Sequence, residues 1–299
     1  MGSETPPEVL IPSVLNVIQK WPSFSFLLYL PETLSVPTLE NVTVITCSQK
    51  IAMDDEPRKA IKQNPKSSLV QALKGISAGD GFISCCNTGA FVLASGLYVS
   101  KLPGVHRPAL VAEMSLLQSP VYILDVGGTA QRAAQQLQEW AYLGKGYAEA
   151  RGTRSPKIGL LNIGVEEMKG AEEHREVVEK LFSMSHFVGN IEPQDILSGK
   201  VDVVVTDGFS GNILLKSFEA ISLYWLSQMP KGDVRTSIQS KMSDSMQQGA
   251  LLVGYEAYLM KCHGSSSQDT FAGALTKLLS LMERSTIDKL KEHLLVGQA

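Results

Sequence analysis

Short apolar runs rich in β-branched residues recur along this chain, and each is followed by a small polar loop and a helical pattern. Four strands are predicted in this way, at residues 81–84, 121–124, 157–162 and 201–205. The helices predicted after them cover residues 90–100, 131–142, 166–182 and 213–229. Near-continuous apolar strands that alternate with helices are typical of a parallel sheet buried on both faces. The sequence therefore predicts an α/β fold, with three layers and a doubly wound, mostly parallel sheet.

Composition and charge exclude several classes of protein. The chain has 299 residues, of which 44% are hydrophobic and 19% charged, and this suits a packed core and not a disordered chain. The net charge is −3 without a basic block, so no nucleic-acid partner is expected. The longest apolar run has five residues, whereas a transmembrane helix needs about 20.

The cysteine and histidine spacings indicate neither a disulfide framework nor a metal site. The four cysteines contain no C-x-x-C pair, and the five histidines form no H-E-x-x-H motif. The first residues have no basic start and no apolar signal-peptide core. We therefore expect reduced thiols, a cytoplasmic location, no metal and no organic cofactor.

The loops after the predicted strands suggest an anion site. Ligands of such sheets bind at the carboxyl ends of the strands, where loops lead into helix N-termini. The loops read CCNTGA (85–90), DVGGTA (125–130), NIGVEE (162–167) and DGFSGN (207–212). They contain glycine for close backbone approach and Asn, Asp, Thr or Ser for capping. Any one such loop is ordinary in this fold class, but four together favour an anion, with phosphate first.

The sequence lacks the motifs of a nucleotide site and does not place a hydrolase motif in the required structural context. The chain has no Walker-type phosphate loop and no G-x-G-x-x-G after a strand. The sequence GISAG (75–79) matches the spacing of a nucleophile elbow, which joins a strand to a following helix. Here a helical run precedes it and a strand follows, so we interpret it as a helix-to-strand turn.

Three further features have less certain meanings when each is considered alone. Lys169 lies in the charged predicted helix, where a solvated surface is the ordinary interpretation. His263 lies in the small polar loop CHGSS (262–266), which is a credible phosphate cradle before a helix. The predicted helix 213–229 is apolar on more than one stripe, which favours core or subunit packing and leaves contact with a membrane surface as an alternative.

Taken in order, the loops resemble a known family. GFISCCNTGA (81–90), RPAL (107–110), LDVGG (124–128), IGLLNIGVEEMKG (158–170), FVGNIE (187–192), DVVVTDGFSGNILLKSFE (202–219) and KCHGSSS (261–267) follow the order of blocks in the PlsX-type phosphate acyltransferases of phospholipid synthesis. The resemblance covers nearly the whole chain. It implies an isocitrate- or isopropylmalate-dehydrogenase-like fold with a helical protrusion, formed by one domain over residues 1–299. A helical dimerisation segment is expected at residues 213–255.

The resemblance also implies a reaction. A long-chain fatty acyl group would move from acyl carrier protein to inorganic phosphate, giving acyl phosphate for phosphatidic acid synthesis. Phosphate is already anionic near neutral pH, and the leaving thiol has a pKa of about 8.5, so positioning and oxyanion stabilisation are the main requirements. Neither needs a metal or a nucleotide.

The expected site residues fall into two groups. In the catalytic group, Lys169 is expected to neutralise phosphate or oxyanion charge, and Asn212 to donate to the oxyanion. His263 is expected to hold phosphate or to protonate the thiolate, and Asp207 to orient its neighbours. The phosphate-binding group comes from two loops and consists of Asn87, Thr88, Gly89, Gly264, Ser265 and Ser266.

The expected partners are acyl carrier protein, inorganic phosphate and a second copy of the chain. The resemblance leaves open a membrane glycerol-3-phosphate acyltransferase as a further partner, and peripheral attachment at the inner face of the membrane. Two alternative functions also stay open. One is a phosphate acyltransferase for short acyl-coenzyme A substrates, and the other is a non-catalytic relative that binds phosphate or acyl carrier protein.

The sequence departs from the family pattern in three places. The family begins with a strand that ends in aspartate and is followed by Met-Gly-Gly-Asp, whereas this sequence begins at Met1-Gly2-Ser3-Glu4. We therefore expect the first family strand to be missing here. Cys85-Cys86 stands where Ala-Gly is usual, and Gly128-Thr129 where Ala-Asn is usual. Residues 230–248 are short and polar where relatives have a basic helical hairpin.

Overall fold

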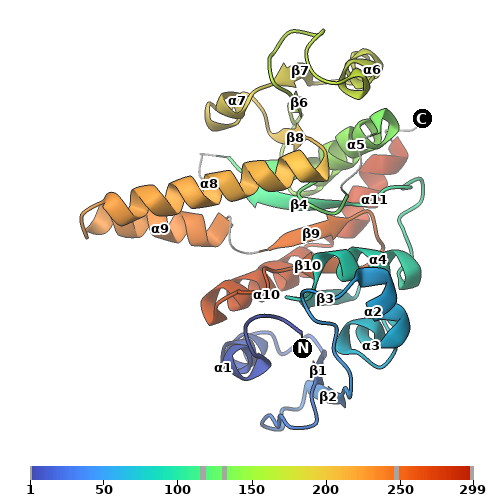
Figure 1. Ribbon diagram of the computed structural model, residues 1–299, viewed down its shortest axis with the longest axis vertical. Coiled ribbons are helices and arrows are strands. Elements are labelled where there is room, and N and C mark those ends of the chain that lie inside the picture. Colours follow the sequence, from blue (N-terminus) through green and yellow to red (C-terminus); the bar gives the residue numbers. More distant parts are fainter. Residues whose placement is uncertain (1, 115–118, 130–132, 246–248, 297–299) are drawn as a thin grey trace. The chain divides into compact units, whose positions relative to one another are not determined.

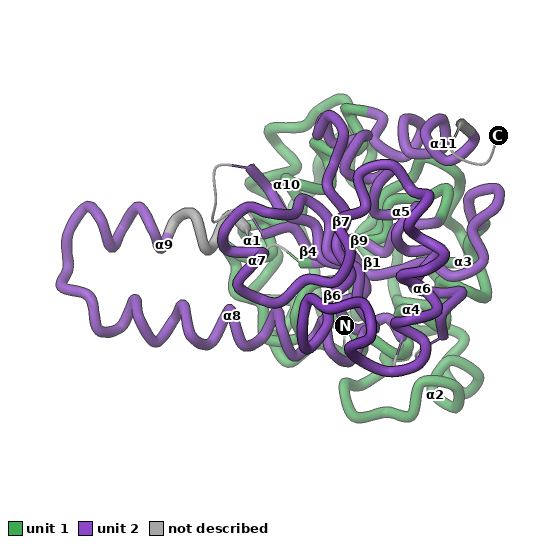
Figure 2. Tube along the Cα trace, turned by 90° about the horizontal axis from the view of Figure 1, so that it is seen from above, with its two compact units in different colours: residues 1–100, 247–249, 255–284 green, residues 101–246, 250–254, 285–299 purple. Residues whose placement is uncertain are grey.

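The computed structural model describes residues 2–114, 119–129, 133–245 and 249–296. Figure 1 shows the helices and strands along the chain. The chain divides into two compact units (Figure 2). Unit 1 comprises residues 1–100, 247–249 and 255–284. Unit 2 comprises residues 101–246, 250–254 and 285–299.

Unit 1 combines two pairs of parallel strands with five helices among its described residues. β1 pairs with β2 in parallel, and β3 pairs with β10 in parallel. The elements are α1 (Pro7–Ile18), β1 (Phe26–Leu30), β2 (Val42–Thr46), α2 (Pro57–Gln63), α3 (Ser68–Lys74), β3 (Gly81–Ser84), α4 (Thr88–Tyr98), β10 (Tyr258–Lys261) and α10 (Gln268–Glu283).

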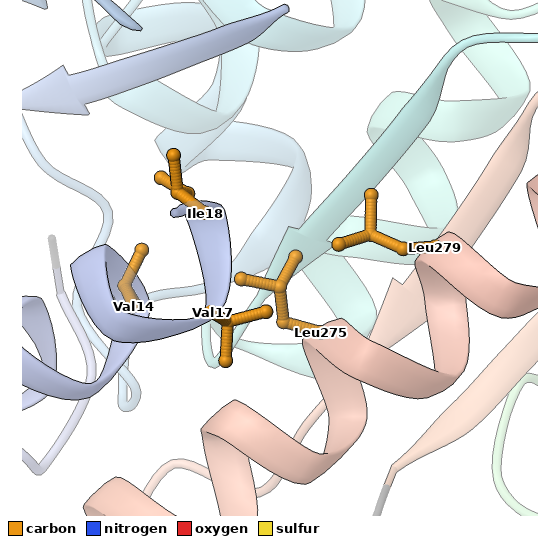
Figure 3. Close-up of a cluster of buried hydrophobic side chains, with 5 residues drawn as sticks. All are labelled: Val14, Val17, Ile18, Leu275 and Leu279. Atoms are coloured by element: carbon orange, nitrogen blue, oxygen red, sulfur yellow. The ribbon is translucent and has the colours of Figure 1, made fainter. Parts of the chain in front are cut away.

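The packing of α1 against α10 forms one core cluster of unit 1 (Figure 3). Proline at the first position of α1 starts this helix, because its fixed φ suits the first turn. Val14, Val17 and Ile18 repeat at helical spacing and so share one face. They meet Leu275 and Leu279, which lie one turn apart on α10.

An apolar cavity of about 480 Å³ lies between β1 and β3. Every residue of both strands lines it, together with residues of α1, α3 and α10. Cys85, the first residue after β3, lines it as well. This volume is within the range of ligand pockets, roughly 300–1,000 Å³.

Unit 2 contains six strands in the order β9-β4-β5-β8-β6-β7 among its described residues. The pairs of β5 with β8, β8 with β6, and β6 with β7 are parallel, whereas β4 runs antiparallel to β5 and β9. The elements are β4 (Ala109–Met114), β5 (Val121–Leu124), α5 (Ala134–Ala150), β6 (Ile158–Leu161), α6 (Glu172–Leu181), β7 (Phe187–Ile191), α7 (Pro193–Leu197), β8 (Val203–Val205), α8 (Gly208–Gln228), α9 (Asp233–Ser245), β9 (Ala250–Val253) and α11 (Thr286–Val296).

The core of unit 2 lies between α5 and the parallel strands. Trp140 and Leu137 of α5 are fully buried. A Cβ on Gly144 would lie 2.7 Å from Val203 Cγ1 and 2.8 Å from Leu124 Cδ2. Glycine therefore lets the helix approach the sheet closely, and α11 packs against another part of α5.

α8 and α9 form a helical hairpin that projects from the rest of unit 2 (Figure 2). Several large apolar side chains of α8 are exposed, among them Ile221, Tyr224 and Trp225. The helical part of the predicted segment 213–255 ends at Ser245, and β9 follows within that segment. Its role in dimerisation stays a prediction.

The predicted α/β fold with a mostly parallel sheet is confirmed. The strands predicted at 81–84 and 121–124 coincide with β3 and β5. The helix predicted at 131–142 is α5, whose described part begins at Ala134, and residues 131–132 lie outside the described residues. The GISAG sequence is confirmed as a turn between α3 and β3, where the Asp80 carboxylate accepts a hydrogen bond from the Ser77 amide.

Candidate functional site

Two loops of unit 1 lie at the same edge of the β3–β10 pair. β3 and β10 are parallel, and Ser84 lies opposite Lys261 at their carboxyl ends. The loop after β3 leads into α4, and the loop after β10 leads into α10. The first N–H groups of a helix have no acceptor within the helix, so each loop ends at backbone donors and at a positive dipole end.

Asn87 fixes the loop after β3. Its Oδ1 accepts a hydrogen bond of 3.0 Å from the Ala90 amide and so caps α4. Its Nδ2 donates to the carbonyls of Met53 at 2.7 Å and Asp55 at 3.2 Å. Asn87 therefore acts as a cap and a tether, and the neighbouring Thr88 and Gly89 begin the helix.

Hydrogen bonds within the loop after β10 hold it in place. Ser266 Oγ donates to the His263 carbonyl at 2.8 Å, and the Ser266 amide donates to the same oxygen at 3.2 Å. His263 and Ser265 are exposed, whereas Gly264 and Ser266 are buried. The Gly264 carbonyl accepts from the Thr5 amide at 3.0 Å. The altered N-terminal segment thus packs directly against this loop.

The structure therefore brings the predicted phosphate-binding residues together on two neighbouring loops of unit 1. It also adds two residues that the sequence reasoning missed. Lys261, the last residue of β10, is buried and donates from Nζ to the Cys262 carbonyl. Met53 lies next to both loops. Its carbonyl accepts from Asn87 in the loop after β3, and its Cε would lie 2.9 Å from a Cβ added to Gly264 in the loop after β10. For Lys261, the only available signal was its position directly before the CHGSS loop.

In unit 2, Asp207 caps α8. Its Oδ1 accepts from the Ser210 amide at 2.9 Å, and its Oδ2 accepts from the Ser210 hydroxyl at 2.8 Å. The carboxylate is buried, with 1% of the residue exposed. The helix predicted at 213–229 thus begins five residues earlier, at Gly208, because the DGFSG sequence caps and opens it.

Asn212 lies in the first turns of α8, beside the loop that follows β5. A Cβ on Gly127 would lie 3.6 Å from Asn212 Cγ. Gly127 has a φ of +124°, a conformation that glycine adopts most readily. The DVGG and DGFSGN sequences, which are far apart along the chain, are therefore in contact, with the Asn212 amide beside Gly127.

The expectation that Lys169 lies in a helix is wrong. α6 begins only at Glu172, and residues 163–171 form a loop. Gly170 has a φ of +85°, which a right-handed helix does not allow. The side chain of Asn162 donates to the Lys169 carbonyl at 2.9 Å, and Asn190 donates to the Glu166 carbonyl at 2.9 Å. These two amides hold the loop and leave the Lys169 side chain exposed.

The three predicted residues of unit 2 lie at one edge of its parallel strands, Lys169 on a loop, Asp207 at the N-cap of α8 and Asn212 in its first turns. β8 lies between β5 and β6, and all three run in the same direction. Asp207 and Asn212 follow β8, and Lys169 follows β6. An amide donor and an exposed cation thus come from adjacent strand ends, where ligands of parallel sheets bind.

Comparisons with known proteins identify the family. The family model described as "Fatty acid synthesis protein" matches residues 1–289. The phosphate acyltransferase of Streptococcus agalactiae serotype III (strain NEM316) is 35% identical, over 97% of this chain and 96% of its own length. The phosphate acyltransferase of Enterococcus faecalis (strain ATCC 700802 / V583) is 33% identical, over 98% of this chain and 96% of its own length. The chain belongs to this phosphate acyltransferase family. The predicted family and enzyme class are thereby confirmed.

Solved structures agree on the fold. The EutD phosphotransacetylase from Staphylococcus aureus has a TM-score of 0.57 at 14% identity, over 93% of this chain and 92% of its own. A branched-chain phosphotransacylase from Enterococcus faecalis V583 has a TM-score of 0.60 at 16% identity, over 92% of this chain and 96% of its own. At these identities the likeness shows the fold alone.

The described residues contain neither a metal-binding cluster nor a membrane-spanning helix. No group of three or more His, Cys, Asp or Glu side chains is arranged there to hold a metal ion. None of the described helices is long and apolar enough to cross a membrane.

Proposed function

We propose that this family member transfers a long-chain fatty acyl group from acyl carrier protein to inorganic phosphate and releases acyl phosphate. The observation that carries the proposal is the pair of loops after β3 and β10. Each loop leads into the N-terminus of a helix of at least eleven residues, and the two strand ends are adjacent. Backbone amides and helix dipoles that converge in this way suit a phosphate ion.

The buried ammonium of Lys261 supports the same assignment. It is held at the end of β10 by its hydrogen bond to the Cys262 carbonyl. A cation held next to an amide-rich loop lowers the free energy of a bound dianion, because Coulomb attraction is stronger where water is partly excluded. We therefore add Lys261 to the proposed phosphate-binding residues.

The reaction balances without further reactants. A phosphate oxygen attacks the thioester carbonyl carbon, and its electron pair forms the new C–O bond. The carbonyl oxygen becomes an oxyanion in the tetrahedral intermediate. The C–S bond then breaks, the carbonyl re-forms, and the carrier thiolate takes up a proton. Catalysis then requires that the two substrates are positioned and that the oxyanion is stabilised.

The residues take the roles that their surroundings permit. Lys169, exposed on its loop, neutralises phosphate or oxyanion charge. The Asn212 amide donates to the oxyanion. His263 holds phosphate or protonates the leaving thiolate. Asp207 acts as a positioning residue, because its buried carboxylate fixes the first turn of α8 and hence Asn212.

The test uses the full chain with palmitoyl-acyl carrier protein and phosphate, and it follows the release of the carrier thiol. We expect phosphate-dependent release and a matching amount of acyl phosphate. Lys169→Ala should lower kcat/KM at least about 100-fold, since one preorganised electrostatic contact is worth that much. Lys180→Ala is the matched control, because Lys180 is also an exposed lysine of unit 2 but pairs with Glu176 on α6.

Each other outcome has a definite meaning. Release from palmitoyl-coenzyme A or acetyl-coenzyme A but not from the carrier protein would favour the alternative acyl donor. Phosphate binding without any acyl phosphate would favour the non-catalytic alternative. Unchanged turnover in Lys169→Ala would remove the proposed role of that residue and leave the reaction intact.

We also propose that the enzyme works as a homodimer. The exposed apolar side chains of α8 support this, because apolar surface that is left exposed on a projecting helix is typical of an interaction site.

A further inference from the structure

Two cysteines of unit 1 are direct neighbours at the strand ends that carry the two phosphate loops. Ser84 and Lys261 are the last registered pair of the parallel β3–β10 ladder, and Cys85 and Cys262 follow them. The Cys262 amide still donates to the Ser84 carbonyl at 2.9 Å, so the ladder extends to these positions. Both cysteines are buried, and the register places them opposite each other at the ends of the two strands.

The two thiols have opposite electrostatic surroundings. The hydrogen bond from Cys262 lowers the pKa of the Cys85 thiol, and a hydrogen bond to Ser266 and the charge of Lys261 act in the same direction. The pKa of Cys262 is raised well above its ordinary value by the hydrogen bond to Cys85 and by burial. A thiolate is the nucleophile in thiol chemistry, so Cys85 is the more reactive partner.

A path to Cys85 also exists. Its side chain lines the cavity between β1 and β3, which is large compared with a peroxide molecule. Cys262 does not line that cavity. An oxidant that enters the cavity therefore meets Cys85 first and finds Cys262 directly behind it.

We propose that Cys85 and Cys262 are a peroxide-sensitive pair that closes to a reversible intramolecular disulfide. The Cys85 thiolate attacks one oxygen of a hydroperoxide and breaks the O–O bond, which gives a sulfenic acid at Cys85 and releases water or an alcohol after proton uptake. The Cys262 thiol then attacks the Cys85 sulfur, the S–O bond breaks, and water leaves as the disulfide forms. Overall, the two thiols lose two electrons and two protons to the hydroperoxide.

The disulfide would join the two phosphate loops covalently. Neighbouring strands are about 4.8 Å apart, which lies within the roughly 4.4–6.8 Å that separates the Cα atoms of a disulfide, so the bond can close and would fix the two loops to each other. The oxidised enzyme should therefore lose turnover, an expectation that rests on the proposed function.

The experiment measures mass first and activity second. The reduced full chain is treated with hydrogen peroxide, alkylated, and analysed without reductant by peptide mapping and intact mass. We expect a loss of two hydrogen atoms, a crosslink between the peptides of Cys85 and Cys262, and at least a tenfold fall in phosphate-dependent thiol release. Dithiothreitol should restore both the mass and the turnover.

Matched cysteine variants separate the pair from the other thiols. Cys85→Ser and Cys262→Ser should form no crosslink, and their turnover, relative to each untreated variant, should resist peroxide. Cys47→Ser, at a buried cysteine after β2, should respond like the unmodified chain. Cys86→Ser serves the same purpose beside the pair, because burial raises the pKa of that thiol.

The proposal is overturned if peroxide leaves all thiols free, if Cys86 or Cys47 forms the crosslink, or if Cys85 stops at sulfenic or sulfinic acid. The mass readout does not depend on turnover. A crosslink in a chain that makes no acyl phosphate would therefore contradict the proposed function and leave the disulfide standing.

Discussion

At the scale of single residues, Asp125 shows how much one side chain holds in place at the end of β5. Its Oδ1 accepts hydrogen bonds from the amides of Leu110 and Gly128 at 3.0 and 2.9 Å, and its Oδ2 accepts from the Thr129 amide at 2.7 Å. The residue is fully buried. Burial raises the pKa of its carboxyl above the ordinary value of 3.8, although these amides oppose the shift.

This raised pKa predicts a particular pH dependence of stability. An acid whose pKa is higher in the folded state binds its proton more tightly there. The protonated group therefore stabilises the folded state at pH values below its pKa in the unfolded chain, and this stabilisation is lost as pH rises through the pKa of the folded state. Compared with Asp125→Asn, which cannot ionise, the unmodified chain should therefore lose free energy of unfolding as pH rises from about 3.8. Urea denaturation of both chains across this pH range measures the difference.

The same comparison can contradict the prediction. Asp195, whose pKa is lowered by a hydrogen bond from the Glu192 amide, provides the matched control. Asp195→Asn should show the opposite slope, with the unmodified chain gaining stability relative to the variant as pH rises. If Asp125 and Asp195 gave slopes of the same sign, burial would not dominate at Asp125.

At the scale of elements, glycine determines how closely α8 approaches the loop after β5. A Cβ on Gly211 would lie 2.0 Å from the Asp125 carbonyl oxygen and 2.7 Å from Thr206 Cγ2. The first of these contacts is with backbone, so a side chain cannot fit unless the helix moves. We expect Gly211→Ala to lower the free energy of unfolding by about 3 kcal/mol, as overpacking does, and to lower turnover by displacing Asn212.

Gly96 of α4 is the matched control for this prediction. A Cβ there would lie 3.6 Å from the Tyr255 hydroxyl, which is ordinary contact. Gly96→Ala should therefore leave stability unchanged or raise it by up to about 1 kcal/mol, because alanine favours the helix. Equal stability of the two variants in urea denaturation would show that α8 has room to shift.

The cavity between β1 and β3 also belongs to this scale. In the described part of the chain, β1 pairs only with β2, and β3 only with β10 among the strands. Each therefore has one edge whose backbone groups are without a strand partner. A hydrocarbon placed there would leave these polar groups unsatisfied, whereas an extended peptide could pair with both edges.

A chain carrying an added apolar strand tests this argument. Ser3 and Pro7 line the cavity, so a segment joined before residue 2 has access to it. We expect an extension of alternating valine and isoleucine to raise Tm by roughly 5 °C or more, because about 2–4 °C corresponds to each kcal/mol in a chain of this size. An extension of equal length made of glycine and serine should have no effect. Equal Tm values would show that the cavity does not accept a strand.

At the scale of the whole molecule, the sequence predicted the parallel strands that are followed by helices better than the antiparallel strands and the irregular loops. The valine-rich β8 and the strand β5 were visible because parallel strands buried on both faces are continuously apolar. The antiparallel β4 and β9 were not predicted, because their apolar runs have no helix after them. Lys169 was misplaced because its many charged neighbours imitate a helix surface, while the Asn162 and Asn190 hydrogen bonds that shape the loop are long-range.

In the candidate site, the residues in local sequence patterns could be predicted, whereas contacts between distant segments could not. Asn87 and Asp207 were predictable, because a capping residue after a strand and before a helix is a local pattern. The burial of Lys261 was not predictable, since it depends on which strands become neighbours of β10. The contact between Asn212 and the DVGG loop likewise needs the three-dimensional placement of α8 beside β5.

The apolar surface of α8 leads to the last prediction, which concerns association of the whole chain. Trp225 and Tyr224 are 59% and 60% exposed. If a second copy covers them, Trp225→Glu should place a charge in that contact, and burying an unpaired charge costs several kcal/mol. We expect the variant to sediment as a monomer at concentrations where the unmodified chain is a dimer, with a Kd at least about 100-fold higher.

Lys216→Glu controls for charge alone, because Lys216 is an exposed residue of the same helix and its substitution changes the net charge by more. It should leave the dimer intact. If Trp225→Glu remained dimeric and instead lost binding to phospholipid vesicles, the exposed surface of α8 would be a membrane contact and not a subunit interface. The two outcomes differ because a dimer contact depends on protein concentration, whereas membrane binding depends on lipid.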